Sequence, residues 1–193
     1  MDLSLVHSII LKDIFIALPD GDKLSPTHHS NICDIFESGL FCNNDVFSEQ
    51  GSKCYRWGFL VSGMMKSSSM MPNNKTRFRD FNYPGYNIVV GDFDSITSRE
   101  VSKQTIYSMN DSFLIYTYEA VFNNLCLSTP YLSGIGKNIS QFAHRAKKQY
   151  LQDCEGMTNF QKETKFENDY SSIGKKINIG ERAYYFDMSR NKK

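Results

Sequence analysis

The stretch 24–40, LSPTHHSNICDIFESGL, constrains the fold more than any other part of the chain, because it predicts a fixed polar loop followed by a short helix. Ser30 and Asn31 are residue types that cap helix N-termini, and Gly39 suits a helix C-terminus. Apolar residues follow at the spacing of one helix face, at positions 32, 35, 36 and 40. Backbone N–H groups at such a helix start favour an anionic ligand such as a pyrophosphate.

Length and composition indicate a single domain over residues 1–193. Apolar residues make up 40% and aromatic residues 13% of the chain, which is enough to build a core. The aromatic content favours a β-rich or mixed fold, because aromatic side chains suit half-buried strands. The net charge of +1 does not indicate a nucleic-acid-binding protein, so any such surface would have to be a local basic patch.

The five cysteines include no Cys-x-x-Cys pair, so the sequence does not predict a zinc site. We expect reduced thiols and a cytoplasmic location. The apolar segment 3–18 is interrupted by Lys12 and Asp13 and lacks the basic start of a signal peptide. It is also too short and too charged to span a membrane.

Four further segments are expected to form strands and one more a helix. The strands are expected at 13–18, 54–61, 86–90 and 112–121, and the helix at 139–151. Arg56 lies among apolar and aromatic neighbours in the second of these strands. A buried arginine needs a partner, which would be a carboxylate or a ligand phosphate.

The segment 62–80 is rich in Ser, Met, Asn and Lys and is interpreted as a long, mobile, basic loop. Lys75, Arg77 and Arg79 alternate with aromatic residues there. Such a pattern could hold phosphates and stack bases, so these three residues are candidates for binding a nucleic-acid substrate.

The segment 91–95, Gly-Asp-Phe-Asp-Ser, follows the clearest strand of the chain. Asp92 and Asp94 could bind Mg²⁺ through their carboxylate oxygens. The string resembles the Gly-Asp-x-Asp-Ser motif of thiamine pyrophosphokinases, which leaves open a metal-dependent nucleotide or diphosphate enzyme. The alternative is a turn followed by a helix that an aspartate caps.

The pattern Thr-His-x-x-Asn-Ile at 27–32, followed by Ile-Phe-x-x-Gly-Leu, resembles the opening of the DarT-type ADP-ribosyltransferases. The resemblance implies an α+β fold in which two small packed β-sheets with flanking helices surround an NAD cleft. In that family the matching segment lines the NAD pocket. The resemblance therefore implies that Thr27, His28 and Asn31 bind NAD, with Tyr55 or Tyr86 stacking on the nicotinamide.

The same resemblance implies which residues are catalytic, and it implies a site without a metal ion. Arg56 lies at the spacing of an arginine that contacts NAD in the family, and Glu163 takes the place of the catalytic carboxylate. Glu167 is the second choice for that carboxylate. A glutamate there would stabilise the positive charge that develops when nicotinamide leaves NAD.

The implied activity is an NAD-dependent ADP-ribosyltransferase that modifies a nucleobase in single-stranded DNA, a toxin paired with a macrodomain antitoxin. Three alternatives stay open. One is an ADP-ribosyltransferase effector that modifies a host protein, the second is the metal-dependent enzyme that uses Asp92 and Asp94, and the third is an interaction protein without activity.

Overall fold

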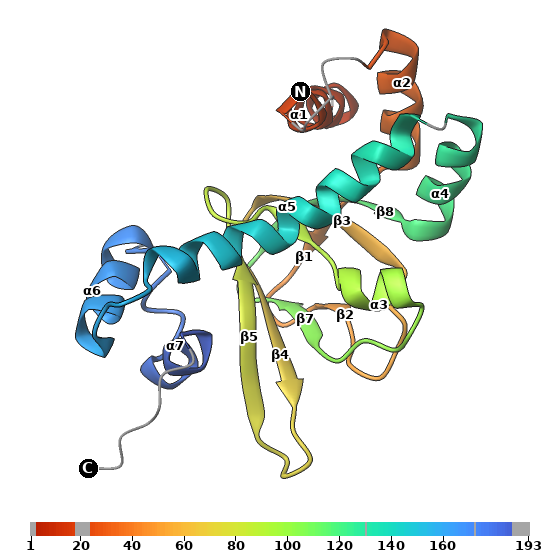
Figure 1. The fold of residues 1–193 in the computed structure, drawn as a ribbon. Helices are drawn as coiled ribbons and strands as arrows, with labels where there is room; N and C mark the ends of the chain where they lie inside the picture. The colour runs from red at the N-terminus through yellow and green to blue at the C-terminus, as the bar shows by residue number, and fades with distance from the viewer. Residues whose placement is uncertain (1–2, 18–23, 130, 172, 187–193) are drawn as a thin grey trace.

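Two antiparallel β-sheets of four strands each form the centre of the molecule (Figure 1). A computed structural model describes residues 3–17, 24–129, 131–171 and 173–186. One sheet has the strand order β1-β8-β3-β6 and the other has the order β2-β7-β4-β5. The strands are β1 (Glu37–Phe41), β2 (Val46–Ser48), β3 (Arg56–Ser62), β4 (Met65–Met70), β5 (Thr76–Asn82), β6 (Val89–Val90), β7 (Thr105–Ser108) and β8 (Ser112–Tyr118).

The space between the sheets is filled by apolar side chains, because alternate residues of a strand point to opposite faces. Along β3, Leu60 joins this inner core, whereas Trp57 and Phe59 belong to the core on the other face of the sheet. Six strands each contribute one buried residue to the inner core: Phe47, Leu60, Met65, Val90, Ile106 and Leu114.

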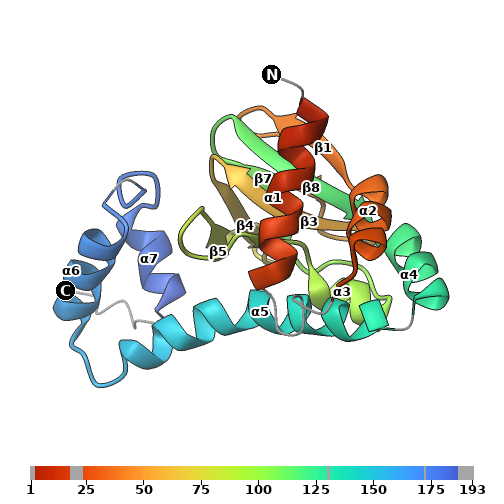
Figure 2. The same ribbon diagram turned by 90° about the horizontal axis from the view of Figure 1, so that it is seen from above.

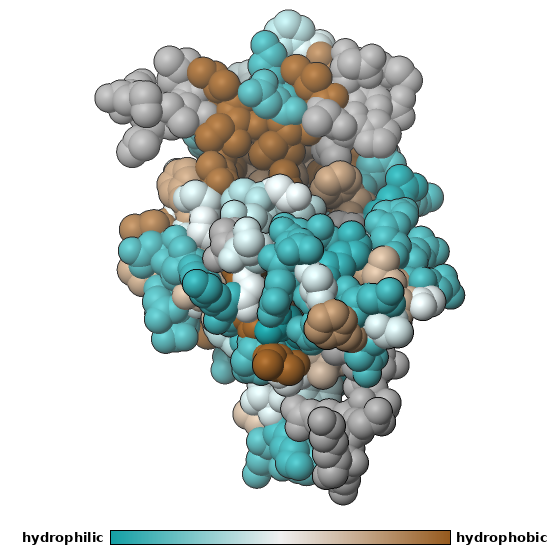
Figure 3. All heavy atoms as spheres, turned by 90° about the vertical axis from the view of Figure 1, so that its left-hand side faces the viewer, coloured by the Kyte–Doolittle hydropathy of each residue, from teal (hydrophilic) through white to brown (hydrophobic). Residues whose placement is uncertain are grey.

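Helices cover the outer face of the β1-β8-β3-β6 sheet. They are α1 (Leu3–Ala17), α2 (Pro26–Ile35), α3 (Phe93–Ser98), α4 (Glu119–Ser128) and the first half of α5 (Tyr131–Asp153). The hydrophobic residues near the top of Figure 3 lie at the height of α1 and α2 in Figure 1, while the rest of that face is mostly hydrophilic. On α1, Ile9 and Ile16 are exposed.

The long helix α5 connects the two ends of the molecule, with α2 and α4 at one end and α6 and α7 at the other (Figure 2). The last two helices are α6 (Asn159–Asp169) and α7 (Ile179–Tyr185). A third core, of aromatic residues, joins them to the end of α5 and to β5. Its buried aromatic members are Phe78, Phe81, Tyr150, Phe166, Tyr170, Tyr185 and Phe186.

Several expected elements are confirmed. The helix expected at 139–151 lies within α5, and the strands expected at 54–61 and 112–121 correspond to β3 and β8. The strand expected at 112–121 ends at Tyr118, earlier than expected, because α4 begins at Glu119. The strand expected at 86–90 is confirmed only at Val89–Val90. No helix in the described ranges is long and apolar enough to cross a membrane.

Two expectations about secondary structure are wrong. The segment 13–17 belongs to α1 rather than to a strand, and position 18 and the turn at 19–21 lie outside the described residues. The segment 62–80 is not a mobile loop but the hairpin of β4 and β5. Its serines are buried between strands, where Ser67 Oγ donates to the carbonyl of Asp80.

Candidate functional site

A cavity of about 660 Å³ lies between α3, the β4–β5 hairpin and α5. Its volume is in the range of small-molecule sites. The lining combines strand residues, the segment that begins at Gly91 and includes α3, and one face of α5. The strands contribute Ser67, Arg79, Asp80, Asn82, Val89 and Ile106, and α5 contributes Ala143, His144 and Lys147.

Helix α3 is held at the edge of the cavity by Asp92. The Asp92 carboxylate accepts a hydrogen bond from the backbone N–H of Ser95 at 3.3 Å and one from the hydroxyl of Ser102 at 2.6 Å. Ser102 is ten residues further along the chain, so these contacts fix both α3 and the loop after it. Asp94 is almost fully exposed, 4.0 Å from His144. In the described part of the chain, no group of three His, Cys, Asp or Glu residues could hold a metal ion.

Two buried asparagines fix the opposite wall. Asn82 Nδ2 donates to the carbonyl of Val89 at 2.7 Å, and Asn87 Oδ1 accepts from the Val89 N–H at 3.2 Å. Asn87 Nδ2 also donates to the carbonyl of Ala143 on α5 at 3.3 Å. These bonds tie β5, β6 and α5 together, so the cavity has a preformed polar wall.

Asp80 and Lys147 are the charged groups at the junction of β5 and α5. Burial raises the pKa of Asp80 to about 6, against the lowering effects of Lys147, of the hydrogen bond from the Phe81 N–H and of His144. The Lys147 ammonium donates to the carbonyl of Arg79 and lies 5.0 Å from the ring centre of Tyr185. Asp80 is therefore poised to change its charge near pH 6.

A second cavity, of about 610 Å³, lies between α5, α6 and the end of α7. Four residues line both cavities: Asp80, Ala143, His144 and Lys147. The second cavity is bounded by lysines and by the aromatic residues Tyr185 and Phe186. The two spaces therefore meet at Asp80.

Thr27, His28 and Asn31 do not line this cavity. Their helix, α2, packs against α1 and α4 instead. The helix begins at Pro26 rather than after Asn31. Ser25 caps it by accepting from the His28 N–H at 3.2 Å, and His28 Nδ1 accepts from the Ser25 N–H at 3.4 Å. This capping box satisfies part of the helix start that the sequence assigned to an anionic ligand. Gly39 lies in β1 and does not end the helix.

Arg56 has protein partners instead of a carboxylate or a phosphate. Its Nε donates to the carbonyl of Phe47 at 3.0 Å, and its guanidinium carbon lies 4.7 Å from the ring centre of the same residue. Phe41 and Tyr116 complete an aromatic cage around it. The neighbouring Tyr55 is 62% exposed, and neither Tyr55 nor Arg56 lines the cavity.

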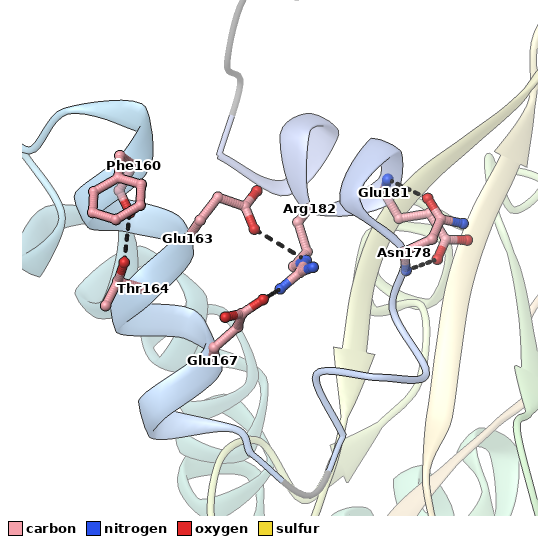
Figure 4. A network of polar contacts seen from close by, with 7 residues as sticks. All are labelled: Phe160, Glu163, Thr164, Glu167, Asn178, Glu181 and Arg182. Carbon is pink, nitrogen blue, oxygen red and sulfur yellow. Dashed lines mark hydrogen bonds and ion pairs between the residues drawn. The ribbon is translucent and has the colours of Figure 1, made fainter.

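Glu163, the expected catalytic carboxylate, lies on α6 (Figure 4). Its carboxylate is 3.1 Å from Nε of the buried Arg182 on α7, and Glu167 accepts from Nη1 of the same arginine at 2.8 Å. Burial raises the pKa of Glu163, while Arg182 opposes the rise. The two glutamates are one helical turn apart, so both face the same arginine and join α6 to α7.

The three basic residues of the hairpin have different surroundings. Lys75 is exposed in the turn between β4 and β5, and Arg77 lies over the ring of Tyr184 at 6.0 Å. Arg79 alone of the three lines the cavity, and its Nε donates to the hydroxyl of Ser69 at 2.9 Å. Whether any of them binds a ligand stays a prediction.

Comparison with solved structures identifies the fold. The chain is similar to a cyclic nucleotide-binding domain from Methylobacillus flagellatus, with a TM-score of 0.61, 10% sequence identity, and coverage of 89% of this chain and 84% of that one. It is also similar to the regulatory domain of protein kinase A from Toxoplasma gondii with cAMP, with a TM-score of 0.55, 11% identity, and coverage of 72% and 52%.

A third similar structure is the regulatory subunit of a cAMP-independent protein kinase A from Trypanosoma cruzi bound to guanosine. Its TM-score is 0.52 at 10% identity, with coverage of 67% of this chain and 44% of that one. The chain spans about half the length of these kinase subunits. No protein-family model and no curated protein sequence matches the chain.

These findings correct the interpretation based on ADP-ribosyltransferases. The fold class is not that of an ADP-ribosyltransferase, and the transferase activity, the toxin function and NAD as a cofactor are wrong. Single-stranded DNA and a macrodomain antitoxin are not supported as partners, and neither is the metal-dependent enzyme. Because NAD binding is not supported, the NAD-dependent roles of five residues are not supported either. These residues are Thr27, His28, Asn31, Arg56 and Glu163.

Sequence reasoning missed most of the cavity. Asn82 and Asn87 flank a Tyr-Pro-Gly turn, and Lys147 lies on the basic face of the helix expected at 139–151; neither pattern indicates a ligand site. The one local signal was Gly-Asp after a strand, which marks the start of α3 at residues 91–92. The tertiary fold brings these groups together from distant parts of the sequence. Asn87 and Ala143, for example, are 56 residues apart in the chain and joined by a hydrogen bond.

Taken together, the two four-stranded antiparallel sheets, a short helix between β6 and β7, and a long helix after β8 give this chain the fold of the cyclic nucleotide-binding domains.

Proposed function

We propose that this chain is a regulatory or sensor domain that binds a nucleotide or a nucleoside in the cavity between α3, β5 and α5. The observation that carries the proposal is the cavity of about 660 Å³ with a preformed polar wall, in a fold whose solved examples hold cAMP or guanosine. Backbone and side-chain donors and acceptors around such a cavity fix the orientation of a small molecule.

The proposal includes a single domain over 1–193 and a cytoplasmic location. All five cysteines are free thiols, which fits a reducing compartment. Binding would act through α5, because this helix lines the cavity and also carries α6 and α7 at its far end. This arrangement lets occupancy of the cavity be transmitted to another part of the protein.

Calorimetry with cAMP, cGMP, adenosine and guanosine tests the proposal, with thermal unfolding as a second readout, since a ligand that binds only the folded state stabilises it. Val101→Trp fills the cavity from a residue that is half exposed, so binding should be lost while the fold is kept. Leu127→Trp is the matched control, because Leu127 is 82% exposed on α4 and outside the lining. Absence of binding by the wild type would show that the function is different.

A further inference from the structure

We propose that Arg79 is the specificity-determining residue of this cavity and that its guanidinium binds two adjacent acceptor atoms of the ligand. The inference rests on the proposed function and adds to it the chemical group that the site selects. It depends on where Arg79 lies, on what holds it and on which of its donors are already used.

Arg79 is presented to the cavity by the hairpin of β4 and β5. It lies in β5 opposite the shift in register between Ser67 and Ser68, an irregularity of the kind that redirects a side chain, and it is half-buried. Its Nε donates to the hydroxyl of Ser69, which is itself only 2% exposed. Ser69 therefore fixes the plane of the guanidinium and leaves the two terminal nitrogens for other partners.

The other cations near the cavity are already engaged. Lys147 donates to a backbone carbonyl, and the exposed Lys103 lies 4.0 Å from Glu100. Beyond the cavity, Lys66 pairs with Glu181 and Arg182 pairs with two glutamates. Within the described ranges, no ion pair joins Arg79 to a carboxylate. Lys147 likewise has no carboxylate partner in these ranges, but its ammonium is bound to the carbonyl of Arg79. Arg79 is thus a cation of the lining that pairs with no carboxylate and keeps two terminal nitrogens for a ligand.

Within the described ranges, none of the four carboxylates of the lining forms an ion pair with Arg79: Asp80, Asp92, Asp94 and Glu100. The Asp92 carboxylate is hydrogen-bonded to Ser95 and Ser102, at the start of α3. Asp80 accepts from its own neighbour, the Phe81 N–H, at 2.9 Å. A ligand that brings acceptor atoms to the terminal nitrogens of Arg79 would therefore complete the arrangement.

A guanidinium fork matches two acceptors side by side. A nucleotide offers such a pair in two places, the phosphate oxygens and, in guanine, the O6 and N7 atoms. Four ligands separate these sources, because cAMP and cGMP carry the phosphate while guanosine and cGMP carry the guanine edge.

The test measures the affinities of cAMP, cGMP, adenosine and guanosine for the wild type, Arg79→Gln and Arg77→Gln by calorimetry. Losing hydrogen bonds to a charged group corresponds to a loss of about 10- to 100-fold. We expect Arg79→Gln to show this loss for one matched pair of ligands only, either the two cyclic nucleotides or the two guanine compounds. Arg77→Gln, two residues along the same strand and outside the lining, should leave all affinities unchanged.

The outcomes separate the inference from the function on which it rests. If the wild type binds at least one ligand and Arg79→Gln changes none of the affinities, or lowers all of them equally, the inference is overturned and the proposed function stands. Wild type that binds none of the four overturns both. Circular dichroism of Arg79→Gln checks that the variant is folded.

Discussion

Replacing Asp80 by Asn tests whether the charged cavity wall costs stability at neutral pH. Burial holds the pKa of this carboxyl at about 6 instead of 3.8, so the folded protein favours the protonated form. A carboxyl whose pKa is raised on folding favours the folded state fully at pH values below 3.8, where it is protonated in both states. This contribution to the free energy of unfolding is lost as the pH rises from 3.8 through 6. Asparagine keeps the acceptor for the Phe81 N–H but cannot ionise.

The magnitude follows from the two pKa values. A change from 3.8 to about 6 corresponds to at most about 3 kcal/mol, since each tenfold change in an acid constant is about 1.36 kcal/mol. Linkage gives a cost of about 1.6 kcal/mol at pH 5 and about 3 kcal/mol at pH 7.5, because the folded-state carboxyl is still mostly protonated at the lower pH. Asp80→Asn should therefore stabilise the fold, and its advantage should grow by about 1.4 kcal/mol between these pH values.

Urea unfolding at pH 5 and pH 7.5 measures this difference, with the fluorescence of Trp57, the one tryptophan, as the probe. Asp34→Asn is the control, because Asp34 is exposed on α2, and it should change stability by less than about 0.5 kcal/mol at either pH. An Asp80→Asn variant that is less stable than the wild type at pH 7.5 would refute the reasoning. It would mean that attraction to Lys147 outweighs the cost of burying the charge.

Two further substitutions test the contacts that explain misassigned residues. Arg182→Met removes the partner of Glu163 and Glu167. It should lower the free energy of unfolding in urea by about 3 kcal/mol, since the charge of Glu163 is left partly buried. Glu167→Gln, which removes only an exposed partner, should cost at most about 1 kcal/mol, and an equal cost for the two variants would contradict the prediction. Ser25→Ala removes the cap of α2 and should lower thermal stability by about 1 kcal/mol, whereas Ser30→Ala, beyond the helix start, should cost much less.

The parts of the fold that could be predicted are those with a clear local pattern. The continuous apolar run of β3 and the apolar spacing of Ile139, Ala143 and Tyr150 on α5 indicate a strand and a helix without tertiary information. The N-terminal segment failed for a known reason, since a short apolar run fits a buried strand as well as a helix. In the structure this segment is a helix whose Leu11 and Phe15 pack in the same core as Phe59.

The β4–β5 hairpin could not be predicted because its polarity does not reflect its burial. Ser67, Ser68 and Ser69 are each at most 7% exposed, although a serine run is typical of loops. Small side chains fit between close strands, and their hydroxyls bond to groups of the partner strand, as Ser69 does with Arg79. The serines of β4 are buried because β4 pairs with β7 on one side and β5 on the other, and this pairing cannot be read from composition.

The candidate site shows the same limit at the level of single residues. A carboxylate after a strand can bind a metal or cap a helix, and the sequence around Asp92 is compatible with both. In the structure both oxygens of Asp92 have protein partners, because the Ser95 N–H donates to Oδ1 at 3.3 Å and the Ser102 hydroxyl donates to Oδ2 at 2.6 Å. His28 is a parallel case, because its Nδ1 is used by the Ser25 N–H. A polar atom is available to a ligand only when the fold gives it no other partner. Ser69 occupies Nε of Arg79 but not its two terminal nitrogens, so Arg79 is the residue of the cavity to test first.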